Sequence, residues 1–172
     1  MDVVRTYLEL TSSDAFRPAS PLGPNARLVR HDPCSPARYR QLYADVGGPW
    51  HWRDRCAWDD DTLQRHLTSP SISVFELFVD GASAGYFELR KSDENEVEIA
   101  YFGLVPACIG RGLGGALLTA AVEEAWRFGG RRVWLHTCTL DSPHALPNYK
   151  ARGFRPYRVE HYEASVERPT SL

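Results

Sequence analysis

The sequence predicts a single α/β domain built on a mixed sheet and flanked by about four helices. Its length of 172 residues suits one domain, and a hydrophobic share of 43% beside 24% charged residues is typical of globular proteins. Strand-like and helix-like patterns follow one another in the order β-α-α-β-β-β-α-β-α-β from residue 26 onwards. The three consecutive strands predict an antiparallel meander within the sheet.

The N-terminal segment divides into a strand and a loop. Residues 3–10, VVRTYLEL, alternate like a strand, whereas residues 12–24 are rich in serine and proline. We expect residues 1–24 to be an addition at the sheet edge or a mobile arm of the single domain 1–172. Residues 26–32, ARLVRHD, form the next expected strand.

Two helices and an aromatic loop are expected before the meander. Ser35 and Pro36 suit the N-cap and first position of a helix that runs to about Val46 and stops at the Gly47-Gly48 pair. Residues 49–58, PWHWRDRCAW, form a loop with three tryptophans. The acids at 59–61 favour the N-terminal end of a short helix that runs to about Leu67.

Residues 72–105 predict three strands joined by turns at Asp80-Gly81 and at residues 93–95. A long apolar helix follows a glycine-rich turn and ends near Phe128. Residues 131–138 predict another strand, and residues 142–153 a helix capped by Ser142 and ended by Gly153. Residues 155–167 alternate like a terminal strand.

Charge and composition exclude several classes of protein. The net charge of −2 provides no basic surface for nucleic acid or for a membrane. No long apolar run or secretory signal is present, so we expect a soluble, cytoplasmic protein. The four cysteines lie far apart and form no C-x-x-C pair, which favours reduced thiols over a metal site or a disulfide framework.

The glycine-rich turn at residues 109–115, IGRGLGG, predicts a phosphate site. It follows a strand and opens a helix, whose first N–H groups are unpaired and whose dipole is positive at that end. A Walker-type loop is excluded because the required lysine is missing. Gly110, Gly112 and Gly115 match G-x-G-x-x-G, but a dinucleotide-binding domain would place this turn in its first βαβ unit, directly after the strand.

Two motifs resemble the GNAT superfamily of N-acetyltransferases. The stretch EIAYFGLVP at 98–106, followed by GRGLGGALL at 110–118, is similar to the family's acidic strand, proline and glycine-rich helix start. The stretch YKARGF at 149–154 is similar to a second motif, an aromatic residue before Gly-Phe. The sequence departs from the family at Ile109, where Gln or Arg is usual, and at Ser142, where Asn is frequent.

This resemblance implies a GNAT-like fold that binds acetyl-CoA as a co-substrate and uses no metal. In the family, the central sheet splays between two parallel strands, here 97–105 and 131–138, and the pantetheine arm lies in the gap. The resemblance implies that the thioester carbonyl meets backbone near Leu104 and Val105, where Gly103 would permit a bulge. The coenzyme phosphates would then meet Ile109, Gly110, Arg111, Gly112, Leu113, Gly114 and Gly115, with Ser142 as a further contact.

Three residues are candidates for moving protons. The resemblance implies Glu98 as general base, directly or through water, and Tyr149 as the acid that protonates the thiolate. Strand alternation puts Glu98 on the face of Ala100, Phe102 and Leu104, at a polar–apolar border that would raise its pKa. His136, near the end of the neighbouring strand, is an alternative base because histidine titrates in the right range.

The acceptor is expected to be a primary amine of a small molecule or peptide. Trp50, Trp52 and Asp54 in the aromatic loop suggest an aromatic, partly acidic rim that suits a cationic amine. The alternative function is a catalytically silent, CoA-binding sensor, because the glycine turn would serve binding equally well. A further alternative is a nucleotide-dependent oxidoreductase, which the G-x-G-x-x-G spacing would suit. Exposed strand edges and the N-terminal arm would suit a homodimer.

Overall fold

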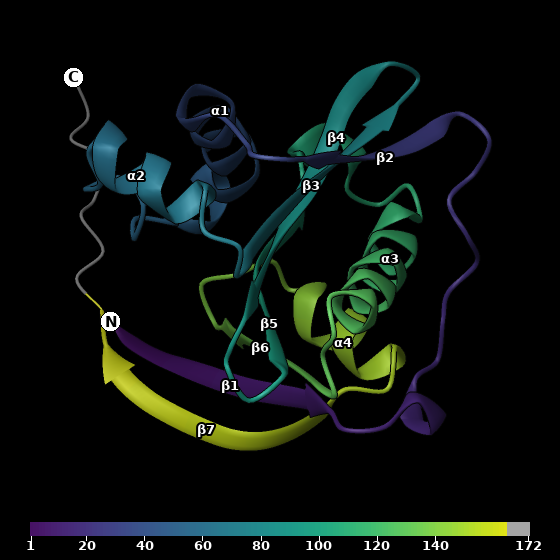
Figure 1. Ribbon diagram of the computed structural model, residues 1–172. Coiled ribbons are helices and arrows are strands. Elements are labelled where there is room, and N and C mark those ends of the chain that lie inside the picture. Colours follow the sequence, from purple (N-terminus) through teal and green to yellow (C-terminus); the bar gives the residue numbers. More distant parts are fainter. Residues whose placement is uncertain (165–172) are drawn as a thin grey trace.

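The structure, a computed structural model, describes residues 1–164 as one α/β domain built on a mixed sheet (Figure 1). Its strands are β1 (Asp2–Leu10), β2 (Ala26–His31), β3 (Ile72–Val79), β4 (Ala82–Lys91), β5 (Glu96–Leu104), β6 (Arg132–Cys138) and β7 (Arg155–Glu163). Its helices are α1 (Pro36–Gly47), α2 (Asp60–Leu67), α3 (Leu113–Arg127) and α4 (Ala145–Ala151).

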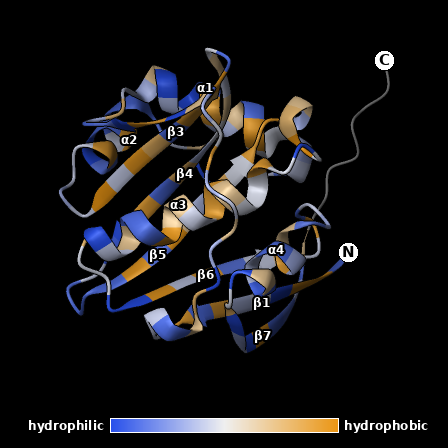
Figure 2. Cartoon of the chain, turned by 90° about the vertical axis from the view of Figure 1, so that its right-hand side faces the viewer, coloured by the Kyte–Doolittle hydropathy of each residue, from blue (hydrophilic) through white to orange (hydrophobic). Residues whose placement is uncertain are grey.

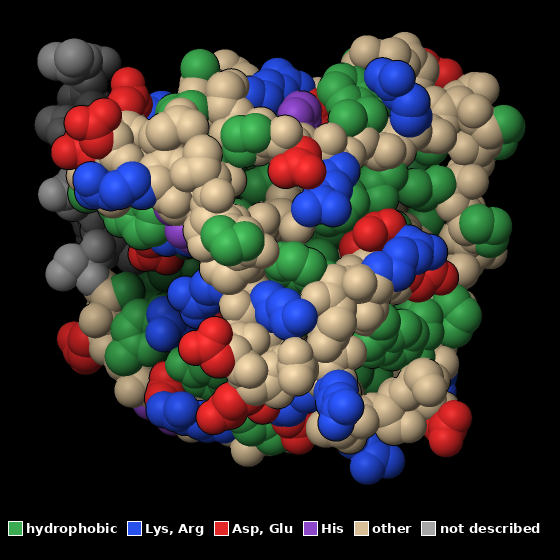
Figure 3. Space-filling model, viewed as in Figure 1, with side chains coloured by type: hydrophobic (Ala, Val, Ile, Leu, Met, Phe, Trp, Pro, Cys, Tyr) green, Lys and Arg blue, Asp and Glu red, His purple; other side chains and the backbone are tan. Residues whose placement is uncertain are grey.

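The helices cover opposite faces of the seven-stranded sheet, whose order is β2-β3-β4-β5-β6-β1-β7. Helices α3 and α4 pack on one face with buried residues such as Phe87 and Leu117. Helices α1 and α2 pack on the other, against residues such as Val74 and Tyr86. Figure 2 shows hydrophobic segments along the central strands and α3. Figure 3 shows charges of both signs interspersed over the visible surface, as the small net charge predicts.

The sheet opens at its centre, as the resemblance to the GNAT superfamily implies. Strands β5 and β6 run parallel, but only the stretch Glu96 to Glu98 pairs with β6, opposite Arg132 to Trp134. All other neighbouring strands are antiparallel. Beyond Glu98 the two central strands diverge, and the separation leaves room for a ligand between them.

The first strand corrects the expectation of an edge strand or mobile arm. Strand β1 lies between β6 and β7 and pairs antiparallel with both, with Arg5 opposite Cys138 on one side and Glu160 on the other. Since β1 is antiparallel to both neighbours, β6 and β7 run in the same direction, and the N-terminal strand lies between them. Leu8 and Leu10 of β1 are buried in the core beneath α3.

A bulge in β5 changes which side chains share a face with Glu98. Tyr101 pairs with Glu88 and Ile99 with Leu89, so Ala100 is the extra residue. The register therefore puts Glu98 on the same face as Tyr101, and not with Phe102 and Leu104 as simple alternation predicted.

Gly103 does not form the bulge that was expected there. A Cβ at this residue would lie 2.6 Å from Cγ1 of Val46, so the glycine permits close packing of α1 on β5.

Helices α1 and α2 begin where their caps predict. Ser35 accepts a hydrogen bond from the Arg38 N–H at 3.2 Å, and Asp59 accepts one from the Thr62 N–H at 2.8 Å.

Helix α4 instead begins at Ala145, three residues after the expected start at Ser142. This start places Pro147 in the first turn, where a missing N–H costs no helical hydrogen bond. Strand β7 ends at Glu163, and residues 165–167 of the expected strand lie outside the described residues.

None of the helices in residues 1–164 is long and apolar enough to cross a membrane.

Candidate active site

A cavity of about 440 Å³ lies where β5 and β6 diverge. One wall consists of residues 99–104 of β5, and the opposite wall includes His136 and Cys138 of β6. The glycine turn and Tyr149 contribute from the α3 and α4 side, and the loop at residues 50–54 contributes from the other side of the sheet. The cavity therefore connects the predicted phosphate site with the predicted acceptor loop.

The glycine turn has the geometry of an anion site. Gly110 and Gly112 have φ angles of 80° and 76°, which an L side chain adopts only with strain. Gly112 is the N-cap of α3 and no side chain caps the helix, so its first N–H groups remain available. A Cβ added at either glycine meets nothing within 4 Å, so the backbone is open to a ligand. This cradle fits the phosphates of a coenzyme.

The backbone of β5 presents N–H groups to the gap. The Val105 N–H donates to the Ala84 carbonyl at 2.9 Å and is thus used by β4. Because successive peptide groups in an antiparallel strand alternate in direction, the N–H groups of Phe102 and Leu104 point away from β4, towards β6. Since β6 has diverged at this point, these donors face the cavity.

The residues proposed for the coenzyme fall into two groups. Leu104, Ile109, Gly110, Gly112, Gly114, Gly115 and Ser142 line the cavity. Three others are not part of its lining: Val105, Arg111 and Leu113. Leu113 packs against the core, and the exposed Arg111 directs its guanidinium towards Cys108.

Tyr149 places a phenol on the cavity from α4. Its ring packs edge-on against Phe102 and Phe154, and the side chain is buried except towards the cavity. Among residues 1–164, no side chain or backbone group forms a hydrogen bond with its hydroxyl. Burial and the nearby Asp141 carboxylate raise the pKa of Tyr149 well above its ordinary value, so the phenol is protonated at neutral pH.

Glu98 lies behind the cavity wall and does not line it. The side chain is 6% exposed and pairs with Arg90 of the adjacent strand. Burial raises the pKa of Glu98, and Arg90 partly opposes that rise. The direction agrees with the prediction, but the carboxylate can reach a ligand only through an intervening group such as water.

His136 lies on the cavity wall itself. Its ring is accessible to solvent through the cavity and packs near Tyr7, with 5.5 Å between ring centroids. Surrounding protein atoms and the Arg5 guanidinium lower the pKa of His136, while Asp141 and Asp54 oppose this shift. The imidazole is therefore neutral at pH 7 and able to accept a proton.

The aromatic loop forms the other mouth of the cavity. Trp50, Trp52 and Asp54, the residues expected to contact the acceptor, all line it. The Trp52 indole packs against Tyr101 at 5.0 Å between centroids, and its Nε1 lies 3.5 Å from Oδ1 of Asp141. Asp54 accepts a hydrogen bond from the Tyr101 hydroxyl at 3.1 Å and remains exposed. Two carboxylates and three aromatic side chains thus surround this mouth.

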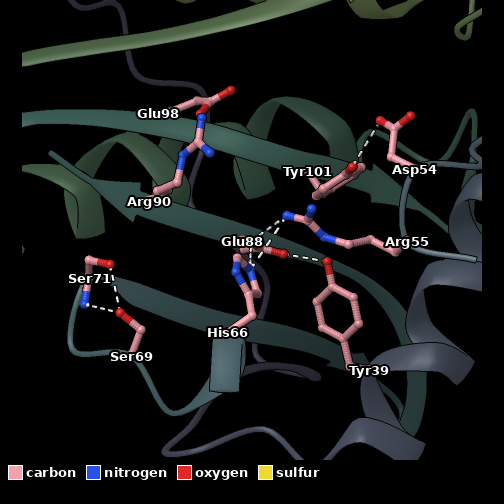
Figure 4. Close-up of polar contacts among 10 residues, drawn as sticks. All are labelled: Tyr39, Asp54, Arg55, His66, Ser69, Ser71, Glu88, Arg90, Glu98 and Tyr101. Atoms are coloured by element: carbon pink, nitrogen blue, oxygen red, sulfur yellow. Dashed lines mark hydrogen bonds and ion pairs between the residues drawn. The ribbon is translucent and has the colours of Figure 1, made fainter. Parts of the chain in front are cut away.

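A buried ion cluster holds this loop in place (Figure 4). Arg55 lies 3.3 Å from Glu88 and stacks on Trp58, with 3.9 Å from the guanidinium carbon to the ring centroid. His66 lies 2.6 Å from the same carboxylate, and the Tyr39 hydroxyl donates to it. The cluster lowers the pKa of Glu88, chiefly through His66, despite complete burial.

Several cavity residues escaped the sequence analysis. Asp141 follows β6 and accepts hydrogen bonds from the Thr137 hydroxyl at 2.7 Å and the Cys138 N–H at 2.9 Å. Its Asp-Ser-Pro context was a turn signal that could have marked it. Asn148 donates to the Gly114 carbonyl at 3.1 Å and links α4 to the glycine turn. Arg5 reaches the cavity only because β1 is an interior strand, which no local pattern indicates.

The part of the chain that the structure describes offers no cluster of metal-binding side chains. Residues 1–164 hold no group of three or more His, Cys, Asp or Glu side chains arranged to bind an ion.

The sequence resembles known acetyltransferases. The model of the Acetyltransferase (GNAT) family matches residues 38–154. An uncharacterised N-acetyltransferase of Mycobacterium tuberculosis (strain H37Rv) is 29% identical over 103 residues, which is 57% of this chain and 66% of that protein. A protein of the same description from Mycobacterium bovis matches to the same extent. The match thus spans just under two thirds of these relatives.

Solved structures share the fold. A GCN5-related N-acetyltransferase from Kribbella flavida superposes with a TM-score of 0.66 at 14% identity, covering 92% of this chain and 56% of that one. An aminoglycoside acetyltransferase from an uncultured soil metagenomic sample, in complex with sisomicin, gives a TM-score of 0.63 at 16% identity, with coverages of 86% and 97%. With the splayed sheet and the glycine turn, the family match leads to one conclusion: the chain belongs to the GNAT family of acetyltransferases.

Proposed function

We propose that this protein transfers an acetyl group from acetyl-CoA directly to a primary amine of a small molecule or peptide. The observation that carries the proposal is the cavity at the splay, which joins an anion cradle, free backbone donors and a protonated tyrosine. Each of these features has a task in acyl transfer. The family match supports the reaction class, and the contacts described above support the roles of particular residues.

The backbone would bind the donor in two places. The N–H groups at the start of α3 receive the phosphates, and the widened gap beside β5 receives the extended arm. The Leu104 N–H points into this gap and donates to the thioester carbonyl oxygen. As the amine nitrogen attacks the carbonyl carbon, negative charge grows on that oxygen, and the same N–H stabilises it.

His136 is the group best placed to take the proton from the amine. It lines the cavity in a neutral state, whereas Glu98 is paired with Arg90 behind the wall and acts at most through water. The C–N bond forms and the C–S bond breaks as the tetrahedral intermediate collapses. Tyr149 then donates its phenolic proton to the leaving thiolate, and solvent restores it.

The acceptor mouth favours a cationic amine. Asp54 and Asp141 carry negative charge beside the Trp52 and Tyr101 rings, and both attract an ammonium group before it loses its proton. A structural neighbour, the aminoglycoside acetyltransferase in complex with sisomicin, fits this interpretation, because an aminoglycoside carries cationic amino groups.

The experiment measures thiol release from acetyl-CoA with a panel of amines, beside a thermal-shift titration with CoA. We expect CoA to stabilise the protein and at least one amine to release thiol. Tyr149→Phe should lower kcat by about 10²-fold or more while CoA still stabilises the variant. Phe154→Leu, which alters packing near the same ring, is the matched control. CoA binding without thiol release from a broad panel would instead favour a sensor.

The two candidate bases separate in the pH profile. His136→Asn should remove the acid limb of kcat/KM, which we expect below the ordinary imidazole pKa of about 6.5. Glu98→Gln should leave that limb in place. If the acid limb is lost in Glu98→Gln and kept in His136→Asn, the base is Glu98.

A further inference from the structure

Arg5 brings a positive charge to the acceptor side of the cavity. It lies on β1 opposite Cys138 of β6 and is part of the cavity lining. Leu8 and Leu10 of β1 face the core under α3, so Arg5, of opposite parity, faces away from α3. The guanidinium therefore lies on the opposite face of the sheet from the helix that carries the glycine turn.

The arginine side chain is held in position, and within residues 1–164 it has no anionic partner. Its guanidinium stacks over the Tyr162 ring at 4.8 Å, and Nη2 lies 3.4 Å from the Tyr162 hydroxyl. Its Nε is buried without a hydrogen-bond partner among residues 1–164, and no carboxylate in that range forms an ion pair with it. The cross-strand neighbour Glu160 is paired instead with Arg158 and accepts a bond from the Tyr7 hydroxyl at 2.8 Å.

An arginine that is held in place without an ion-pair partner can bind the carboxylate of a ligand. A planar guanidinium donates two parallel hydrogen bonds to a carboxylate, and such charge-assisted bonds are stronger than neutral ones. The same cavity carries Asp54 and Asp141, which suit an ammonium group. A ligand with both an amine and a carboxylate would satisfy both sets of groups, whereas a purely cationic amine would be repelled by Arg5.

We infer that Arg5 is a specificity-determining residue that binds a carboxylate of the acceptor. The acceptor class is then an amino-carboxylate, such as an amino acid, an ω-amino acid or a short peptide with a free carboxyl end. This inference rests on the proposed function. It adds a residue that lies outside the 38–154 stretch matched by the family model, on a strand from the N-terminus.

The placement also links recognition to proton transfer. Arg5 lowers the pKa of His136, so a carboxylate bound to Arg5 offsets that effect and makes the imidazole a stronger base. An amine that lacks the carboxylate leaves the weaker base in place. Binding the correct acceptor therefore improves the base that accepts its proton.

The first experiment compares matched acceptors. Glycine and glycinamide, β-alanine and its amide, and ε-aminocaproate and its amide each differ only in the carboxylate. We expect kcat/KM for at least one acid to exceed that for its amide by about tenfold or more in the wild type. Arg5→Gln should abolish this preference by lowering activity with the acid, whereas activity with the amide should not fall, because Arg5 repels a cationic amine and weakens the His136 base. Equal rates for every acid and amide, or an unchanged preference in Arg5→Gln, would overturn the inference.

Two variants serve as controls. Arg30→Gln removes the same charge from an exposed position on β2 and should retain the acid preference. Tyr162→Phe removes the hydroxyl beside Arg5 but keeps the ring under the guanidinium, and should weaken the preference without abolishing it. Loss of the preference in Arg30→Gln would point to a general charge effect and count against Arg5.

The second experiment needs no turnover. The His136 ring signal, identified by its loss in His136→Asn, is followed by NMR in the CoA complex while the same amino acids are added. We expect a saturable shift in the wild type with an acid, none with its amide, and none in Arg5→Gln. Such a shift without thiol release would refute the proposed function while the Arg5 site stands. If thiol is released but the acids neither shift the His136 signal nor react faster than their amides, the Arg5 site is refuted and the proposed function stands.

Discussion

Replacing Glu88 with glutamine is expected to destabilise the protein by about 3–5 kcal/mol, because it breaks one side of a buried ion cluster. Glu88 is 0% exposed and neutralises Arg55 at 3.3 Å, with His66 at 2.6 Å. Glutamine keeps the shape but not the charge. The mostly buried Arg55 guanidinium then stays in the interior without an anion.

The size of the effect makes it easy to measure. Single domains have a free energy of unfolding of about 5–15 kcal/mol, so the expected loss is a large part of the total stability. With a urea dependence of about 1–3 kcal/mol per molar, the unfolding midpoint should fall by about 1–3 M or more. Equilibrium unfolding in urea, followed by tryptophan fluorescence and circular dichroism, gives both values.

The effect should depend on pH with a definite sign. Since the folded protein lowers the pKa of Glu88, its contribution is fully present above the unfolded value of about 4.3 and is lost as pH falls through the folded pKa. The difference in unfolding free energy between wild type and Glu88→Gln should therefore be constant near neutral pH and shrink below about pH 4.

A surface pair supplies the control. Glu123→Gln removes an exposed i,i+4 partner of Arg127 on α3 and should change stability by less than about 0.5 kcal/mol. Because Arg55 supports the loop that lines the acceptor mouth, Glu88→Gln should also raise KM for the amine and leave CoA affinity unchanged. This account of the cluster would be refuted if Glu88→Gln lowered the free energy of unfolding by less than about 1 kcal/mol at neutral pH, or by no more than Glu123→Gln does.

Three further substitutions test other parts of the structure. Leu8→Ala empties a fully buried position on β1 and should cost about 2–5 kcal/mol in urea unfolding, whereas truncating a mobile arm would cost almost nothing. Gly112→Ala puts a Cβ at a φ of 76° beneath the phosphate cradle and should weaken CoA binding by about tenfold or more in calorimetry, with a circular dichroism spectrum like that of the wild type. Gly47→Ala puts a Cβ 2.2 Å from the Trp52 ring, so it should change tryptophan fluorescence and raise KM for the amine but not for acetyl-CoA.

Local sequence signals predicted most of the elements. Caps at Ser35 and Asp59 and turns such as Asp80-Gly81 act over a few residues, so the helix starts and the meander could be predicted from the sequence. The motifs around Glu98 and Gly112 indicated the site for the same reason. The start of α4 was predicted too early because Ser142 has capping chemistry, while Pro147 restricts where the helix can begin.

Long-range packing decided what local patterns could not predict. Alternation in residues 3–10 predicts a strand but not its partners, which lie about 120–160 positions away along the chain. The bulge at Ala100 depends on pairing with β4 and moves Glu98 to a different set of neighbours. Arg5 joins the cavity only through the pairing of β1 with β6, which no local pattern indicates, whereas Asp141 lies in an Asp-Ser-Pro turn directly after β6.

The position of β1 also constrains how the chain folds. Strand β7 can join the sheet only through β1, and β1 only through β6, so these two strands of the seven depend on contacts between the two ends of the described chain. Closing such large loops costs entropy before any contact repays it, which slows folding. During synthesis, β1 leaves the ribosome long before β6 and cannot pair with it until residues 132–138 have emerged. Until then its apolar residues stay exposed, and the wall that holds His136 cannot form.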